Sequence, residues 1–245
     1  MSSKLFSQQA LSLINDTSEY ADYRGKIANQ TFFIERDNFN VSAYVKRGSF
    51  ELKIEDYINC IKDNTKAIEL DSNLGSAYCN RAMAYCFLKQ YKNALNDCDK
   101  QVELEPKIAM SYFNRAYVKG ESGDYIGAIK DLDNAILIRL DYYKAFGSRG
   151  FMNYKLKNFT QSLADYDKAL LLKPDYIETL TNRGSLKYEL KDYKGCIVDF
   201  KQLCEIPFLV LNVKCYEMLG NSYQKIGDKT NAYIYLHKAE SLNIK

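Results

Sequence analysis

The chain has 245 residues, of which 47% are hydrophobic and 27% are charged, so it can bury a sizeable core and is not a disordered polypeptide. The formal net charge is only +3, and the basic residues are spread along the chain, which gives little reason to expect nucleic acid or an anionic membrane as partner. Seven cysteines without a Cys-x-x-Cys pair predict reduced thiols in the cytoplasm.

Residues 1–40 open the chain with two predicted helices, at about 4–15 and 19–37. The segment MSSKLFSQQALSLIN interrupts its apolar residues with Gln8, Gln9 and Ser12, unlike a signal peptide. No stretch approaches the roughly 20 apolar residues of a membrane-spanning helix, so we expect no membrane insertion. Only three prolines and twelve glycines, with helix formers between them, predict an all-α protein.

From Val41 onwards the sequence repeats with a period of 34 residues. An arginine followed by a small residue recurs at Arg47, Arg81, Arg115, Arg149 and Arg183. Twelve residues after that small residue comes a second one, at Cys60, Ala94, Ala128, Ser162 and Cys196, with an aromatic residue three positions before it. Two helices that cross closely need small side chains at the contact and a large ring beside it. Short polar breaks such as KIED, LKQ and ESGD separate the two predicted helices of each unit.

This pattern resembles the tetratricopeptide repeat, a helix–turn–helix unit of about 34 residues. The resemblance implies an all-α, right-handed superhelical solenoid. We expect five repeats over residues 41–208, a sixth over 209–245 after an offset at Pro207-Phe208-Leu209-Val210, and a divergent N-terminal cap or degenerate repeat over 1–40. Either the sixth repeat is a C-terminal cap, or a partner covers its outer face, which includes Tyr233 and Leu236.

An aspartate follows each repeated arginine after sixteen residues, giving the pairs Arg47 and Asp63, Arg81 and Asp97, Arg115 and Asp131, Arg149 and Asp165, and Arg183 and Asp199. In the sixth unit both positions change together, to Leu219 and Tyr235. Because the guanidinium can make two hydrogen bonds to one carboxylate, we predict five partly buried ion pairs. They would join either the two helices of one repeat or adjacent repeats.

Other candidate sites give no support for a metal, a cofactor or an enzyme. Asp97-x-Asp99, Asp131-x-Asp133 and Asp165-x-Asp167 resemble acidic pairs, but residues two apart on a helix point in different directions, so we expect the second aspartate to be an exposed helix charge. Cys60 and Cys196 are expected to be inert packing groups, and a redox or thiol-ligand role for Cys79 and Cys86 stays a minor alternative. His237 has no candidate nucleophile in a fixed relation to it.

The family resemblance also implies a concave groove lined by the first helix of each unit, with Cys79 and Cys86 among its expected lining. The predicted peptide-binding residues are Asn80, Met83, Phe87, Met110, Phe113, Asn114, Tyr117, Lys144, Phe151, Tyr154, Asn182 and Tyr188. Aromatic and sulfur side chains suit an amphipathic helix or an extended peptide with large anchors. The alternatives are that Met83 and Phe113 pack against neighbouring repeats, and that the asparagines are solvated or form caps.

The sequence therefore predicts a non-enzymatic, cytoplasmic scaffold or adaptor that binds a protein or peptide partner. A chaperone or targeting factor for a secreted or membrane client, and a nucleic-acid-binding helical repeat, are the alternatives; the second would need a continuous basic stripe that the predicted groove lacks. The clamp that binds chaperone tails in this family is not expected, since Val45, Ser49 and Met110 stand where it needs polar or cationic side chains. Self-association through the terminal repeats stays open.

Overall fold

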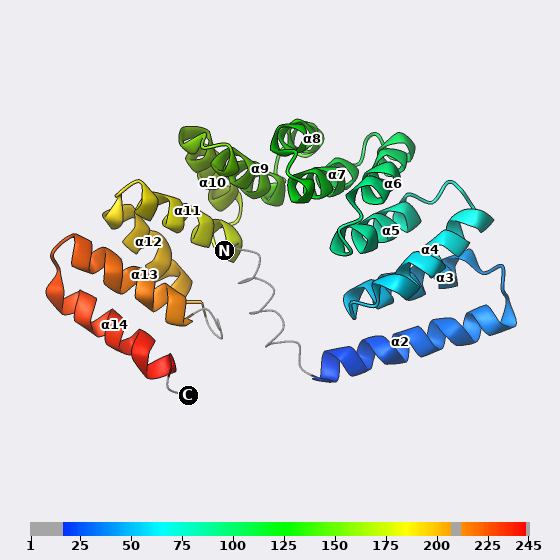
Figure 1. Ribbon diagram of the computed structural model, residues 1–245, viewed down its shortest axis with the longest axis horizontal. Coiled ribbons are helices and arrows are strands. Elements are labelled where there is room, and N and C mark those ends of the chain that lie inside the picture. The colour runs from blue at the N-terminus through cyan, green and yellow to red at the C-terminus, as the bar shows by residue number, and fades with distance from the viewer. Residues whose placement is uncertain (1–16, 207–211, 244–245) are drawn as a thin grey trace. The chain divides into compact units, whose positions relative to one another are not determined.

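The computed structural model describes residues 17–206 and 212–243, and thirteen α-helices account for most of them (Figure 1). These residues contain no β-strand. Contacts divide the chain into two compact units, one within residues 15–140 and one within residues 141–245, and each is described by itself. The predicted helix 4–15 and the predicted offset at Pro207-Phe208-Leu209-Val210 lie outside the described residues.

The unit within residues 15–140 begins with one long helix and continues with three helix pairs. Its helices are α2 (Thr17–Arg36), α3 (Val41–Lys53), α4 (Tyr57–Leu70), α5 (Gly75–Phe87), α6 (Tyr91–Leu104), α7 (Ala109–Ser122) and α8 (Tyr125–Ile138). Each helix packs on the next one, and α5 also contacts both α3 and α7. The predicted helix over 19–37 is present as α2.

The unit within residues 141–245 contains three more helix pairs. They are α9 (Tyr143–Lys155) with α10 (Phe159–Leu172), α11 (Ile177–Glu189) with α12 (Tyr193–Cys204), and α13 (Asn212–Lys225) with α14 (Lys229–Asn243). Here too each helix packs on the next, and α9 contacts α11. The predicted all-α class, built from successive helix–turn–helix pairs, is confirmed. The assignment of 1–40, 41–208 and 209–245 as cap, five repeats and sixth repeat stays a prediction.

A left-handed backbone residue ends the first helix of each pair. It is Gly123 and Gly227 in two pairs and a side-chain-bearing residue in the others: Glu55, Lys89, Lys157 and Lys191, with φ between 60° and 64°. An aspartate often follows and caps the second helix, as Asp124 does by accepting from the Gly127 amide at 2.8 Å. These polar breaks therefore stop and restart the helix within three residues.

The two columns of small residues lie at the helix crossings, as predicted. Cys60, Ala94, Ala128, Ser162 and Cys196 are all 0% exposed. A methyl group added to Gly184 on α11 would lie 2.8 Å from the Phe200 ring on α12, so the side chains of α12 leave no room for a larger residue there. No helix in residues 17–206 and 212–243 has both the length and the hydropathy needed to cross a membrane.

Candidate functional site

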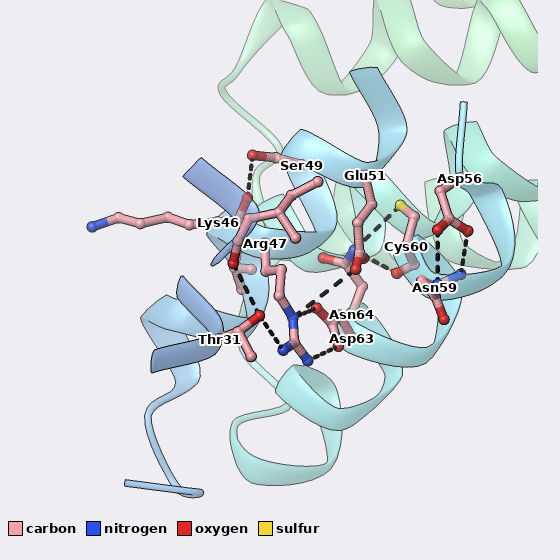
Figure 2. A network of polar contacts seen from close by, with 12 residues as sticks. Thr31, Lys46, Arg47, Ser49, Glu51, Asp56, Asn59, Cys60, Asp63 and Asn64 are labelled. Atoms are coloured by element: carbon pink, nitrogen blue, oxygen red, sulfur yellow. Dashed lines mark hydrogen bonds and ion pairs between the residues drawn. The ribbon is translucent and has the colours of Figure 1, made fainter. Parts of the chain in front are cut away.

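The predicted arginine–aspartate pairs are confirmed, and each joins the first and second helices of one pair. Arg47 Nε lies 2.6 Å from Asp63 Oδ2, and Arg47 Nη2 lies 2.8 Å from Asp63 Oδ1. Figure 2 shows the two side chains facing each other. The same two-bond geometry joins Arg81 to Asp97, Arg115 to Asp131, Arg149 to Asp165 and Arg183 to Asp199. The aspartate side chains are at most 9% exposed, so each carboxylate is stabilised by hydrogen bonds from its arginine instead of by water.

The remaining guanidinium nitrogen, Nη1, reaches the preceding helix pair. It donates to Thr31 from Arg47 (Figure 2), to Thr65 from Arg81, to Asp99 from Arg115 and to Asp167 from Arg183, at 2.6 to 3.0 Å. These four arginines therefore also connect their helix pair to the preceding helices, so both predicted arrangements occur at once. Thr31 belongs to α2, which thus contacts α3 as the second helix of a repeat would.

Asp99 and Asp167 are exposed helix charges, as expected, but their contacts with arginines were not predicted. They are 64% and 63% exposed, yet each accepts a hydrogen bond from an arginine of the next pair. The reason is geometric: these aspartates precede their arginines by sixteen residues, the same interval at which the buried aspartates follow. Each of these arginines lies between the second helix of its own pair and the second helix of the preceding pair, and it donates hydrogen bonds to an aspartate on each.

The residue four positions after the arginine varies between the pairs, and it is in turn Glu51, Tyr85, Lys119, Asn153 and Lys187. Lys119 Nζ lies 2.7 Å from Asp131 Oδ2, and Lys187 Nζ lies 3.0 Å from Asp199 Oδ2. In the first pair this position is Glu51, which is 6% exposed, and its buried Oε2 has no hydrogen-bond partner. Burial, and then the nearby Asp63 carboxylate, raise the pKa of Glu51 to about 8, so Glu51 is mainly protonated at pH 7.

The sixth unit replaces the ion pair with apolar packing. Leu219 is 0% exposed, and the ring of Tyr235 stacks on the ring of Tyr223 with centroids 5.6 Å apart and an interplanar angle of 2°. The joint change of both columns is therefore explained by direct replacement, because an isolated buried charge would be costly.

Seven of the predicted binding residues lie on α5 and α7, in the unit within residues 15–140, and five of these seven are methionine or aromatic residues. Phe87 is 37% exposed and Met110 is 47% exposed, whereas Met83, Phe113 and Tyr117 are partly buried. The Phe87 ring stacks on Tyr57 with centroids 5.1 Å apart. Met83 and Tyr117 also pack against the buried cluster around Ala82 and Cys98. We call these five residues, Met83, Phe87, Met110, Phe113 and Tyr117, the α5/α7 surface.

The amides of two predicted asparagines are engaged within the chain. Asn80 Nδ2 lies 3.4 Å from Val45 O and 3.3 Å from Asn64 Oδ1. Asn114 is 8% exposed, and its Nδ2 donates to Cys79 Sγ at 3.1 Å and to Gln101 Oε1 at 3.3 Å. Each amide therefore connects its own first helix to the preceding one. Cys86, which the sequence places on the groove, is buried at 4% exposure.

The other predicted binding residues belong to the unit within residues 141–245. Lys144 is exposed, while Phe151, Tyr154, Asn182 and Tyr188 are partly buried. The Tyr154 hydroxyl donates to Glu189 Oε2 at 3.0 Å, which links α9 to α11, and burial followed by this carboxylate raises the pKa of Tyr154. The Tyr154 ring lies 6.4 Å from the Phe151 ring, so this aromatic pair is held in place.

Reactive and metal-binding groups are scarce on these helices. In residues 17–206 and 212–243, no three histidine, cysteine, aspartate or glutamate side chains cluster to hold a metal ion. Cys60 and Cys196 are 0% exposed, and burial raises their thiol pKa values to about 12 and about 11. These thiols are inert packing groups, as predicted.

Comparison with known proteins agrees with this geometry. A family model described as tetratricopeptide repeat matches residues 75–108 and 213–243. No curated protein matches the chain in sequence. A chain of the APC/C hetero-tetramer Cut9–Hcn1 is similar in structure, with a TM-score of 0.72 and 14% identity over 90% of this chain and 43% of that one. The present chain thus spans less than half the length of that relative.

Two shorter proteins match over most of their own length. PilF of Pseudomonas aeruginosa has a TM-score of 0.72 and 18% identity, covering 85% of this chain and 93% of PilF. YrrB, described as a tetratricopeptide repeat protein with an unusual peptide-binding site, has a TM-score of 0.55 and 16% identity, covering 76% of this chain and 97% of YrrB. Residues 75–108 and 213–243 therefore match the tetratricopeptide repeat, and the chain shares the all-α fold of these solved structures.

Proposed function

We propose that the protein is a non-enzymatic scaffold or adaptor that binds a peptide or helical segment of a partner protein on the α5/α7 surface. The observation that carries this proposal is the pair of apolar rows on two first helices in contact. Met83 and Phe87 are four residues apart on α5, and Met110, Phe113 and Tyr117 are spaced by three and four on α7. Each row therefore lies along one face of its helix.

The chemistry of these rows suits an apolar anchor on the partner. Met110 and Phe87 remain substantially exposed in the folded chain, although burial of both side chains against a partner would be favourable. Methionine adapts its shape to different partner side chains, and aromatic rings commonly dominate the binding energy of an interface. We therefore expect a segment with large apolar side chains, presented as an amphipathic helix or an extended strand.

The arginine–aspartate pairs support this role by holding the surface in place. Arg81 and Arg115 fix α5 and α7 to their second helices, and Arg115 also reaches Asp99 on the preceding pair. A surface held rigid before binding loses little conformational entropy when the partner arrives. Because the Asn80 and Asn114 amides are already engaged, side-chain anchors rather than main-chain hydrogen bonds would provide most of the affinity.

A second candidate binding surface lies in the unit within residues 141–245. It consists of Lys144, Phe151, Tyr154, Asn182 and Tyr188. None of the seven cysteines is in a disulfide, which supports a reducing compartment such as the cytoplasm. A chaperone or targeting factor would use the same surfaces with a different partner, so the residue-level proposal is the same for that alternative.

The test uses peptides selected from a displayed random library against the wild-type chain, with affinity measured by fluorescence polarisation. Phe87→Glu/Met110→Glu should weaken binding at least about tenfold, since a lost interface anchor costs about 1.4 kcal/mol or more. The matched control is Ile58→Glu/Ile126→Glu, which changes two residues of 56% and 61% exposure on the second helices α4 and α8. Equal binding by both double variants would refute the α5/α7 surface as the binding site.

A further inference from the structure

A chain of hydrogen bonds beneath the α5/α7 surface ends at the amide of Asn114. Gln101 on α6 is 4% exposed, and its Nε2 donates to Glu105 Oε2 at 3.1 Å. This bond fixes the orientation of the Gln101 amide and leaves its Oε1 to accept from Asn114 Nδ2 at 3.3 Å. Asn114 Nδ2 also donates to Cys79 Sγ on α5 at 3.1 Å. The Asn114 side chain is therefore held between three helices, at 8% exposure.

Gln101 is a departure from the repeat, and this departure supplies the acceptor for Asn114. In the unit within residues 141–245, the residue thirteen positions before Asn182 is Ala169. An alanine side chain has no hydrogen-bond acceptor, so Ala169 cannot hold the Asn182 amide in this way. Asn182 is partly buried, whereas Asn114 is buried. The fixed asparagine amide is thus a particular property of the α5/α7 surface.

Other polar side chains of α7 are also engaged within the chain. Ser111 is 0% exposed, and its Oγ donates to Glu105 Oε2 at 2.8 Å. Arg115 Nη2 and Lys119 Nζ lie 2.6 Å and 2.7 Å from the oxygens of Asp131. These helices therefore direct their amide, hydroxyl and cationic groups into the fold and leave methionine and aromatic side chains for a partner.

A helix and an extended segment make different demands on such a surface. A helix pairs its main-chain N–H and C=O groups internally, whereas an extended segment needs partners for them. A main-chain group that is buried without a partner costs free energy, so a surface whose amide is held inside disfavours an extended segment. Two neighbouring rows of large side chains suit the apolar stripe of a helix. The rows are Met83 and Phe87 on α5, and Met110, Phe113 and Tyr117 on α7.

We propose that Gln101 is a specificity-determining residue that makes the α5/α7 surface bind an amphipathic helix of the partner instead of an extended segment. The inference rests on the proposed function and narrows it to one kind of partner. Gln101 acts by holding the Asn114 amide inside the fold, so it is a positioning residue. In Gln101→Ala the Asn114 amide loses this acceptor and becomes available to the main chain of an extended segment.

The test uses the peptide that binds the wild-type chain most tightly among those selected from a displayed random library. An alanine scan identifies two positions that tolerate substitution, and two synthetic versions carry either alanine or glycine at both. Each glycine lowers the stability of a helix about fourfold relative to alanine, so the glycine version should bind at least about tenfold more weakly. Circular dichroism at 222 nm should show more helix in the complex than in its separate components. Equal binding of the two versions would overturn the proposal.

Gln101→Ala separates a role in specificity from a purely structural role. Because the freed Asn114 amide can pair with the main chain of the glycine version, the ratio of the two dissociation constants should fall at least about threefold. The side-chain amide hydrogens of Asn114 should also exchange faster with water, as measured by NMR. A structural role alone would weaken both versions equally. An unchanged ratio would therefore overturn the proposal.

Two further variants complete the set, and circular dichroism establishes that each keeps its helices. Gln101→Met keeps the volume of the side chain without its acceptor, so it should lower the ratio even if Gln101→Ala does not fold. Gln202→Ala is the control, because the Gln202 amide donates to Pro174 O in the other unit, and it should leave the ratio unchanged. Failure of the proposed function gives a different result: Phe87→Glu/Met110→Glu would bind both versions as the wild type does, which would refute the surface and this inference together.

Discussion

Replacing Arg81 with alanine should destabilise the protein more than replacing Arg115 with alanine, although the two arginines occupy the same place in successive repeats. Each makes two hydrogen bonds to its buried aspartate, and each guanidinium carbon lies 5.7 Å from the centre of a tyrosine ring. The difference lies in what remains after the change. Asp131 keeps Lys119 at 2.7 Å, whereas the corresponding position beside Asp97 is Tyr85.

The magnitudes follow from the fate of each aspartate. Asp97 is 8% exposed and loses its cation in Arg81→Ala, so the cost should be about 3 to 4 kcal/mol. Asp131 stays paired in Arg115→Ala, and the lost bond to the exposed Asp99 contributes little, so the cost should be about 1 to 2 kcal/mol. Removing Lys119 as well should bring the Arg115 variant close to the Arg81 variant. Adding Asp97→Ala to Arg81→Ala should cost little more than the single change.

Urea titration followed by circular dichroism at 222 nm provides the free energies, with equal m-values required across the set. Since helix pairs in a repeat protein can open separately, hydrogen exchange in α5–α6 and α7–α8 localises each effect. Equal losses for Arg81→Ala and Arg115→Ala would refute the compensating role of Lys119. Simple additivity of Arg81→Ala and Asp97→Ala would refute the energetic coupling of the pair.

Two further predictions concern Glu51 and the glycines. The folded-state pKa of Glu51, about 8, lies above the ordinary value of 4.5, so the contribution of Glu51 to stability is lost as the pH rises from about 4.5 to about 8. Glu51→Gln should remove this loss. In urea titrations the variant should be more stable than the wild type by at least about 1 kcal/mol at pH 8, with no gain at pH 4. Gly184→Ala should lower the free energy of unfolding by about 1 to 3 kcal/mol, because the added methyl group meets Phe200. Gly25 lies in the exposed middle of α2 with nothing within 4 Å of an added methyl group, so Gly25→Ala should raise the free energy of unfolding by about 0.5 to 1 kcal/mol. Thermal melts that order these two variants oppositely would contradict the packing argument.

The fold and the principal ion pairs could be predicted because they recur. A period of 34 residues places Arg81 and Arg115 at the same position of successive helix pairs, and the joint change to Leu219 and Tyr235 indicates that the two columns touch. The same period contained the signal for Asp99, which precedes Arg115 by the interval that separates Arg115 from Asp131. That contact was missed because only the following aspartate was assigned to each arginine.

Features that occur once in the chain were beyond this kind of prediction. The burial of Asn114 depends on Gln101, which fills a position where neighbouring repeats have alanine. The raised pKa of Glu51 arises from a buried carboxyl group at a position that the later pairs fill with tyrosine, lysine or asparagine. Periodicity carries no information about such departures, which depend on the particular side chains around them.

Site-specific photo-crosslinking tests the binding role of the α5/α7 surface most directly. A photoreactive benzoylphenylalanine replaces Met110 in one variant and, as the matched exposed position on a second helix, Ile126 in the other. Irradiation in cells should link the residue-110 probe to a discrete protein partner through an apolar segment, and the residue-126 probe should give no such product. Equal crosslinking from both positions, or a product from residue 126 alone, would contradict the account.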